Sequence, residues 1–190
     1  MTFNKLFAAL ALTAMLGAGA AQARTVGGVT FPDTVQQAGQ TLELNGIGKR
    51  VFALIVDGYA SALYVPKPAH TAEAILAEPG PKLLYTQFLH AASVNQIRNE
   101  YKSVYNSYCS NHACSAASKQ TFDKILASVQ PVKSGDTASY LIDDGNLTLS
   151  INGRTVVTAH DPEYVHGMLD SLLGAASPTA GYRNGLLGNN

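Results

Sequence analysis

The sequence lacks an excess of charge of either sign. Its 190 residues include 13 basic and 13 acidic side chains, so the formal net charge is zero, and charged residues make up only 14% of the chain. No lysine- or arginine-rich run interrupts this balance. Because nucleic acids and anionic membrane surfaces are recognised by clustered positive charge, we expect neither as a partner.

The sequence also lacks the short motifs that mark several kinds of chemistry. It contains no G-x-S-x-G, no H-E-x-x-H and no phosphate-binding glycine loop, so nothing points to hydrolase or nucleotide chemistry. The five histidines are scattered, and the spacing of His160 and His166 does not place them on the shared helical face that a metal-binding pair uses. We therefore expect neither a cofactor nor a metal ion.

Cysteine is scarce, since only Cys109 and Cys114 are present, with four residues between them. His112 lies between the two cysteines, but no second histidine or carboxylate is close enough in sequence to complete a metal site. A redox-active pair would more typically be C-x-x-C. In an exported protein a close pair of this kind is usually a disulfide, so we predict a structural disulfide between Cys109 and Cys114.

The start of the chain has the pattern of a signal peptide. One lysine precedes an apolar run from Leu6, and small residues then end in Ala21-Gln22-Ala23, which matches an A-x-A cleavage site. The apolar part is shorter than the ~20 residues that span a bilayer, which argues against a membrane anchor. We predict a signal peptide over residues 1–23, export of the protein, and a single mature domain over residues 24–190.

Turn residues and hydrophobic patterns predict alternating groups of strands and helices. Residues 25–56 are rich in Val, Thr and Gly, which favours β-strands. A short helix is expected after Thr71, an N-cap residue, and LLYTQFL follows as a strand. Ser93 and Gln96 form a capping box that opens the next helix. The face of that helix is apolar but rich in tyrosine, at Val94, Ile97, Tyr101, Val104, Tyr105 and Tyr108.

A second helix is expected from about Ser115, and the chain then returns to strands. Asp144-Gly145 and Asn152-Gly153 are hairpin signals, so three strands should follow one another as a meander. Asp161 and Pro162 then cap and start a last long helix, which ends at Gly174. Strands, helices, strands and a final helix together predict an α+β fold with an antiparallel sheet and helices on one face.

Several short segments resemble the chalcone isomerase-like family in their order and spacing. They are VGGVTFPDTV, LNGIGKR followed by GYASALYVP, TAEAILAEPGPK, VKSGD, INGR, and the closing LLG and GLLG. The likeness covers the whole mature chain and is greatest to the exported bacterial branch, which implies a periplasmic or secreted protein. It also implies an open-faced sandwich, in which a helical layer packs on one face of a large antiparallel sheet and leaves a ligand cleft.

The resemblance allows two kinds of function, because the family includes both enzymes and binding proteins. Plant members of the family cyclise chalcones to flavanones, whereas other members do no chemistry and bind fatty acids. Matched to the catalytic pattern, Arg50 is the arginine of a G-x-R turn and Tyr59 stands where the strand threonine belongs. The remaining polar positions fall near Ser93, Glu100 and Val165, so most of the catalytic network is missing. The fatty-acid-binding pattern, an arginine and a strand tyrosine that grip one carboxylate, is kept.

The segment from Arg50 to Val65 allows two geometries. If Asp57-Gly58 is a two-residue hairpin turn, Arg50 faces Val65 and lies roughly 20 Å from Tyr59, at ~3.3 Å per residue. The family resemblance instead suggests one long bent strand with a bulge at Asp57-Gly58, whose extra residue brings Arg50 and Tyr59 to the same face. We favour the bulge, because Gly58 and the extra residue of spacing both suit it, and the proposed cooperation of the two side chains depends on it.

We expect a small amphipathic ligand, held by two groups of residues. Arg50 and Tyr59 would bind a carboxylate by charge-assisted hydrogen bonds, which a buried carboxylate needs to replace its water. The tail would contact Phe52, Leu54, Ile97, Tyr101 and Tyr105.

Two other functions stay open from the sequence. An isomerase of phenolic enones would use Arg50 for a phenoxide and Tyr59 for the developing enolate. A structural or partner-binding domain would leave Arg50 solvated and the tyrosines as amphipathic core residues with wetted tips. We favour a non-catalytic binding protein of a fatty acid or similar acid. The oligomeric state has no signal in the sequence.

Overall fold

The computed structural model describes residues 23–53, 56–175, 177 and 179–189, and a seven-stranded sheet dominates it. Every strand pairs with its neighbours in sequence, and all pairs are antiparallel. The strands are β3 (Thr34–Gln37), β4 (Gln40–Phe52), β5 (Val56–Val65), β6 (Lys82–Phe88), β7 (Thr137–Asp143), β8 (Asn146–Ile151) and β9 (Arg154–His160). A separate hairpin consists of β1 (Ala23–Val26) and β2 (Val29–Pro32). The α+β fold predicted from the sequence is therefore confirmed.

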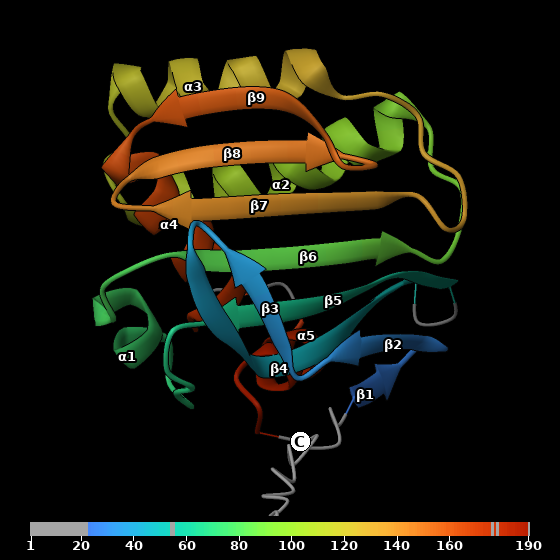
Figure 1. Cartoon of the computed structure of the whole chain (residues 1–190). Helices are drawn as coiled ribbons and strands as arrows, with labels where there is room; N and C mark the ends of the chain where they lie inside the picture. The colour runs from blue at the N-terminus through green and yellow to red at the C-terminus, as the bar shows by residue number, and fades with distance from the viewer. Residues whose placement is uncertain (1–22, 54–55, 176, 178, 190) are drawn as a thin grey trace, which may run out of the picture.

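Helices form the second layer, and Figure 1 shows α2, α3 and α4 behind the strands β6 to β9. The helices are α1 (Ala72–Ala77), α2 (Val94–Asn111), α3 (Ala116–Ser128), α4 (Pro162–Leu173) and α5 (Ala180–Leu186). The predicted caps are present, since Thr71, Ser93 and Asp161 each accept a hydrogen bond from the first turn of their helix. Within the described ranges, none of the helices is both long and apolar enough to cross a membrane.

The two hairpin turns predicted near the end of the chain are confirmed. Asp144 and Gly145 have φ of 46° and 75°, and Asn152 and Gly153 have φ of 49° and 75°. Two consecutive positive φ angles are the mark of a type I′ turn, whose twist matches that of the flanking strands. The strands β7, β8 and β9 form the predicted meander as a result.

The geometry between Arg50 and Tyr59 differs from both sequence-based alternatives. The strands β4 and β5 do form a hairpin, but residues 53–55 connect them, with Ala53 at φ 48°. Gly58 is the extra residue of a bulge, because Arg50 pairs with Tyr59 while Val51 pairs with Asp57. The long bent strand was therefore wrong and the bulge was right. Directly paired residues point to one face, so Arg50 and Tyr59 lie side by side.

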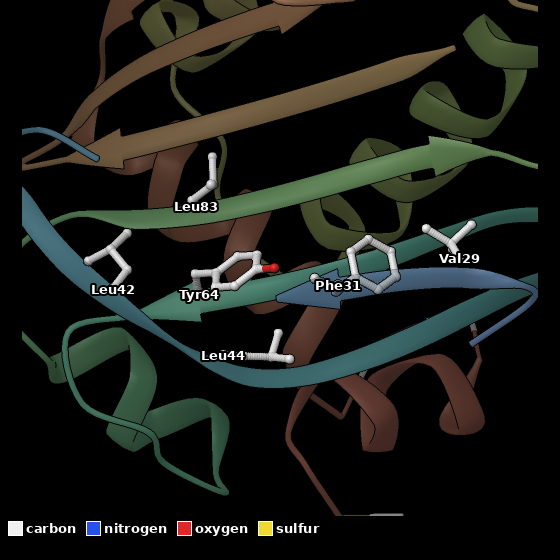
Figure 2. Packing of buried hydrophobic residues seen from close by; sticks show 8 residues of the cluster. Val29, Phe31, Leu42, Leu44, Tyr64 and Leu83 are labelled. Atoms are coloured by element: carbon white, nitrogen blue, oxygen red, sulfur yellow. The ribbon is translucent and has the colours of Figure 1, made fainter. Parts of the chain in front are cut away.

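The core has three parts, on both faces of the sheet. Figure 2 shows the first, where β2 covers the face of the sheet that carries Tyr64. Its buried members are Val29, Phe31, Leu42, Leu44, Ala60, Ala62, Tyr64 and Leu83. The second lies on the helical side, at Leu63, Val65, Ile75, Leu84, Leu173, Tyr182, Leu186 and Leu187. The third joins α3 and α4 to the meander, at Ile125, Ile142, Leu147, Leu149, Val157, Val165 and Leu169.

The helix α5 was not predicted from the sequence, because two of its seven residues are glycines, which disfavour helices. It packs directly on the backbone of β4. A Cβ atom added to Gly46 would lie 2.1 Å from the carbonyl oxygen of Gly185 and 2.5 Å from that of Leu186. Beside it, the buried Asn45 side chain donates to the Leu186 carbonyl at 2.7 Å. Glycine in β4 therefore sets how closely α5 can approach the sheet.

We expect Gly46→Ala to lower the free energy of unfolding by about 3 kcal/mol, because the new methyl group meets rigid backbone rather than a movable side chain. Gly181→Ala, in the helix α5 that packs on β4, is the matched control. Nothing lies within 4 Å of its added Cβ, so this change should raise stability by up to ~1 kcal/mol. Urea denaturation of both variants measures the difference, and equal stabilities would contradict the close packing described here.

Candidate functional site

A cavity of about 560 Å³ lies between the helical layer and the sheet. Its floor comes from the strands β5, β6 and β7, at residues such as Tyr59, Thr86 and Tyr140. Its other walls come from the helices α2 to α5. Sites for small molecules usually enclose ~300 to 1,000 Å³ and are mostly apolar, so this cavity has the size and character of a ligand site.

The helix α2 forms one wall of the cavity. Its wall residues are Gln96, Ile97, Asn99, Glu100, Tyr101, Val104, Tyr105 and Tyr108. None of the residues of α2 is fully buried, although one face of the helix is apolar. This face therefore borders a hollow space instead of packing tightly on the sheet, and the tyrosine-rich stripe in the sequence was the signal for it.

Tyrosine is the characteristic residue of the walls, which include seven of the nine tyrosines in the chain. They are Tyr59, Tyr101, Tyr105, Tyr108, Tyr140, Tyr164 and Tyr182. Burial raises the pKa of Tyr59 and of Tyr140 well above the ordinary value, and a neighbouring tyrosine hydroxyl adds to the shift in each case. Burial likewise raises the pKa of Tyr101, Tyr164 and Tyr182. These phenols are therefore neutral at physiological pH.

Several wall hydroxyls are already bonded within the protein. The hydroxyls of Tyr101 and Tyr140 bond to each other and so connect α2 with β7. The hydroxyl of Tyr182 donates to Ser61 at 2.9 Å, and Ser61 bonds to Thr86 at 2.8 Å. These bonds satisfy polar groups that would otherwise be buried at a cost in free energy.

Arg50 makes its main contact with a carboxylate of the protein itself. Its Nε and Nη2 atoms each lie 3.0 Å from Oε1 of Glu100, on α2. Nη1 donates to the Thr179 hydroxyl at 3.4 Å, and the guanidinium lies 4.8 Å from the centre of the Phe52 ring. The Arg50 side chain is only 12% exposed. Arg50 is thus neither a solvated turn residue nor a free cation, and it connects the sheet to α2.

The structure brings together some of the predicted site residues. Tyr59, Tyr101 and Tyr105 all line the cavity, whereas Arg50 lies behind Glu100 and is not part of the wall. The hydroxyl of Tyr105 is buried and has no hydrogen-bond partner within the described chain. Leu54, expected beside the ligand tail, falls outside the described residues.

The other positions carried over from the catalytic pattern have structural roles, with Glu100 as the exception. Ser93 caps α2 through its side chain, and Val165 is buried in the core between α4 and the meander. Asp57, which is close to Tyr59 in sequence, bonds to Lys49 at 2.8 Å and is not part of the wall. No pattern in the sequence indicates that Glu100 reaches Arg50, because fifty residues separate them in the chain.

The disulfide between Cys109 and Cys114 closes the short connection between α2 and α3, as the spacing of the cysteines predicts. Their Cα atoms are 5.5 Å apart. Because the link ties the end of α2 to the start of α3, it limits how far these two walls of the cavity can separate. Across the described residues, no three His, Cys, Asp or Glu side chains gather in a group that could hold a metal ion.

A curled antiparallel sheet with helices on one side and a cavity between them is what the sequence resemblance implied. Residues 23–188 match the chalcone isomerase-like family, so the chain belongs to that family. Among solved structures, it is similar to a fatty-acid binding protein of Arabidopsis thaliana. The TM-score is 0.68 at 17% sequence identity, over 88% of this chain and 97% of that one. No curated protein matches the sequence.

The buried tyrosines predict a specific loss of stability at high pH. Burial raises the pKa of Tyr64 to about 12, and it shifts the pKa values of Tyr59 and Tyr140 in the same direction. In the unfolded chain these groups lose their protons near pH ~10, so above that pH the unfolded state binds fewer protons than the folded state. The free energy of unfolding should therefore fall as pH rises through this window, and these groups should change nothing below it.

Urea midpoints from about pH 8 to about pH 11, followed together with tyrosinate absorbance, measure this effect. Tyrosinate should form together with unfolding rather than before it. Full ionisation of the tyrosines in a protein that is still folded would contradict their burial.

Proposed function

We propose that this chain is an exported, non-catalytic binding protein that holds a small amphipathic molecule in the cavity between sheet and helices. The observation that carries the proposal is the cavity itself, with the apolar face of α2 turned towards it. A packed domain without a ligand would be expected to fill such a space, because protein interiors are close-packed. The similarity to a protein described as fatty-acid binding supports the same class of ligand.

In the form that the sequence suggests, the ligand is a fatty acid or a similar acid. Its carboxylate would bind Arg50 and the Tyr59 hydroxyl, which the pairing of β4 with β5 supports by setting both side chains on one face. The acid would then have to take the place of Glu100 on the guanidinium. The tail would lie along α2, against Ile97 and Val104.

A series of ligands with increasing tail length tests whether the cavity binds the apolar part. Each buried methylene contributes ~0.8 kcal/mol, so affinity should rise by about fourfold per methylene until the cavity is full. Beyond that length the affinity should level off or fall. Each ligand is titrated into the delipidated protein, and its affinity is measured from the displacement of a fluorescent apolar probe. Affinities that do not depend on tail length would leave the structural role as the better explanation.

A cavity-filling substitution tests where the ligand binds. Val104→Trp places a large ring in the space beside α2, so binding should weaken by about tenfold or more while the folded state is kept. Lys102→Trp is the matched control, because Lys102 lies on the exposed side of the same helix. Native mass spectrometry of co-purified and added ligands measures occupancy. Equal occupancy in both variants would place the ligand elsewhere, and turnover of a phenolic enone would contradict the non-catalytic role.

Export is proposed from the leader pattern in residues 1–23 and is supported by the disulfide, since such bonds persist in oxidising compartments. We expect the full-length chain, expressed with its leader in a bacterium, to be recovered from the periplasm or medium. Its N-terminus should be Arg24, and Cys109 and Cys114 should be oxidised. Intact mass and N-terminal sequencing measure both features, and an uncleaved chain in the cytoplasm would contradict the proposal.

A further inference from the structure

The charged groups of the cavity wall do not suit an ionised acid. Among the described residues, the wall contains no lysine and no arginine, and its carboxylates are Glu100 and Glu163. Glu163 is exposed and accepts a hydrogen bond from the backbone N–H of Ser115. Thus the partly buried charged group of the wall is the carboxylate of Glu100, whose side chain is 22% exposed.

The cation in contact with Glu100 is Arg50, and its guanidinium is already occupied. Two of its donors, Nε and Nη2, contact the same atom, Oε1 of Glu100, at 3.0 Å. The Phe52 ring covers the guanidinium, with 4.8 Å between the ring centre and Cζ. A ligand carboxylate that reached Arg50 without displacing Glu100 would place two negative charges on one guanidinium in a poorly hydrated space, which is unfavourable.

Two polar groups near the Arg50–Glu100 pair remain available to a ligand, and they complement each other. Both contacts from Arg50 use Oε1 of Glu100, so Oε2 has no partner among the residues that the structure describes and can accept a hydrogen bond. The Tyr59 hydroxyl likewise has no partner in the described chain, while its ring makes T-shaped contacts with Phe52, Phe88 and Tyr182. Arg50 pairs directly with Tyr59 across β4 and β5 and contacts Glu100 at 3.0 Å, and Tyr59 and Glu100 both line the cavity, so the two groups lie in the same part of the wall.

We propose that the head group which this cavity fits best is an uncharged hydroxyl, as in a long-chain alcohol, that donates to Glu100 Oε2 and accepts from the Tyr59 hydroxyl. The inference rests on the proposed function and narrows its ligand class. A hydroxyl is both a donor and an acceptor, so it satisfies both free groups. It adds no charge and leaves the Arg50–Glu100 pair intact. An ionised acid must break that pair, and an ammonium ion would lie close to Arg50.

The test compares three probes with the same alkyl chain: hexadecanol, hexadecanoate and hexadecylammonium. Each competes with a fluorescent apolar probe on the delipidated full mature chain, at a pH of about 8, where the acid is ionised. We expect the alcohol to bind about tenfold tighter than the carboxylate. Stronger binding of either ion by the unmodified protein would overturn the inference but leave the proposed function standing. No binding of any probe would overturn both.

Two variants test the assigned contacts. Glu100→Gln removes the charge that blocks Arg50, so the affinity for hexadecanoate should rise by about tenfold relative to that for the alcohol. Glu73→Gln removes the same charge from the exposed first turn of α1 and is the control for net charge. Tyr59→Phe should weaken binding of the alcohol by about fivefold, which is the effect of one hydrogen bond. Tyr85→Phe, which removes a hydroxyl outside the cavity wall, is the matched control.

The variants also give results that would overturn the inference. An equal gain for the acid in Glu100→Gln and Glu73→Gln would mean that overall charge, not the pair with Arg50, sets the preference. An unchanged affinity for the alcohol in Tyr59→Phe would show that the hydroxyl does not bind there. Circular dichroism and urea midpoints confirm that each variant is folded before its affinities are compared.

Discussion

The contact between Arg50 and Glu100 is the interaction on which the cavity depends. An apolar helix face normally holds its helix on a sheet by burying surface, but α2 contributes no fully buried residue. Polar and covalent links therefore add to its packing contacts, such as the stack of Tyr105 on Phe122. They are the Arg50–Glu100 pair to β4, the Tyr101–Tyr140 bond to β7, and the disulfide to α3. The helix can therefore stand away from the strands and leave a hollow space between them.

The same contact explains why the fold alone does not name the ligand. A sheet arginine with a tyrosine beside it can form an anion site, and the pairing of Arg50 with Tyr59 provides that geometry. Whether the site is available depends on a residue of another element. Glu100 satisfies the guanidinium from α2, so a ligand bound as we propose would meet a carboxylate oxygen and a phenol rather than a cation. One side chain thus sets the chemistry of a site whose backbone alone would allow an anion to bind.

Much of the fold could be predicted from the sequence because its signals are local. The capping box at Ser93 and the turn at Asn152-Gly153 involve residues within a few positions of one another, and both predictions are confirmed. The sequence did not reveal α5, since its two glycines disfavour a helix, and its close contact with β4 depends on a glycine of that strand, Gly46. Nor did it place the turn between β4 and β5, because Asp57-Gly58 is also a strong turn signal and the bulge there is defined by pairing across the sheet.

The site divides in the same way into local and non-local features. The tyrosine stripe of α2 was visible in the sequence, since helical spacing alone puts Tyr101 and Tyr105 on one face. What each hydroxyl does could not be seen, because it depends on partners from distant strands. The Tyr101 hydroxyl bonds to that of Tyr140, and the Tyr182 hydroxyl bonds to Ser61. The non-local partners decide which phenols stabilise the fold and which are left for a ligand.

Tyrosine suits such a wall better than leucine or phenylalanine would. Its ring offers a large apolar surface to a tail, and its hydroxyl can be satisfied either by the protein or by a head group. A buried hydroxyl without a hydrogen-bond partner lowers stability. Such a hydroxyl is therefore expected only where it serves a function, such as binding the head group of a ligand. Tyr105 carries this cost while its ring stacks on Phe122, with 4.0 Å between ring centres. Phenols without a hydrogen-bond partner among the described residues, at Tyr59 and Tyr105, therefore distinguish this cavity from an imperfectly packed core, in which apolar side chains would leave no polar group unsatisfied.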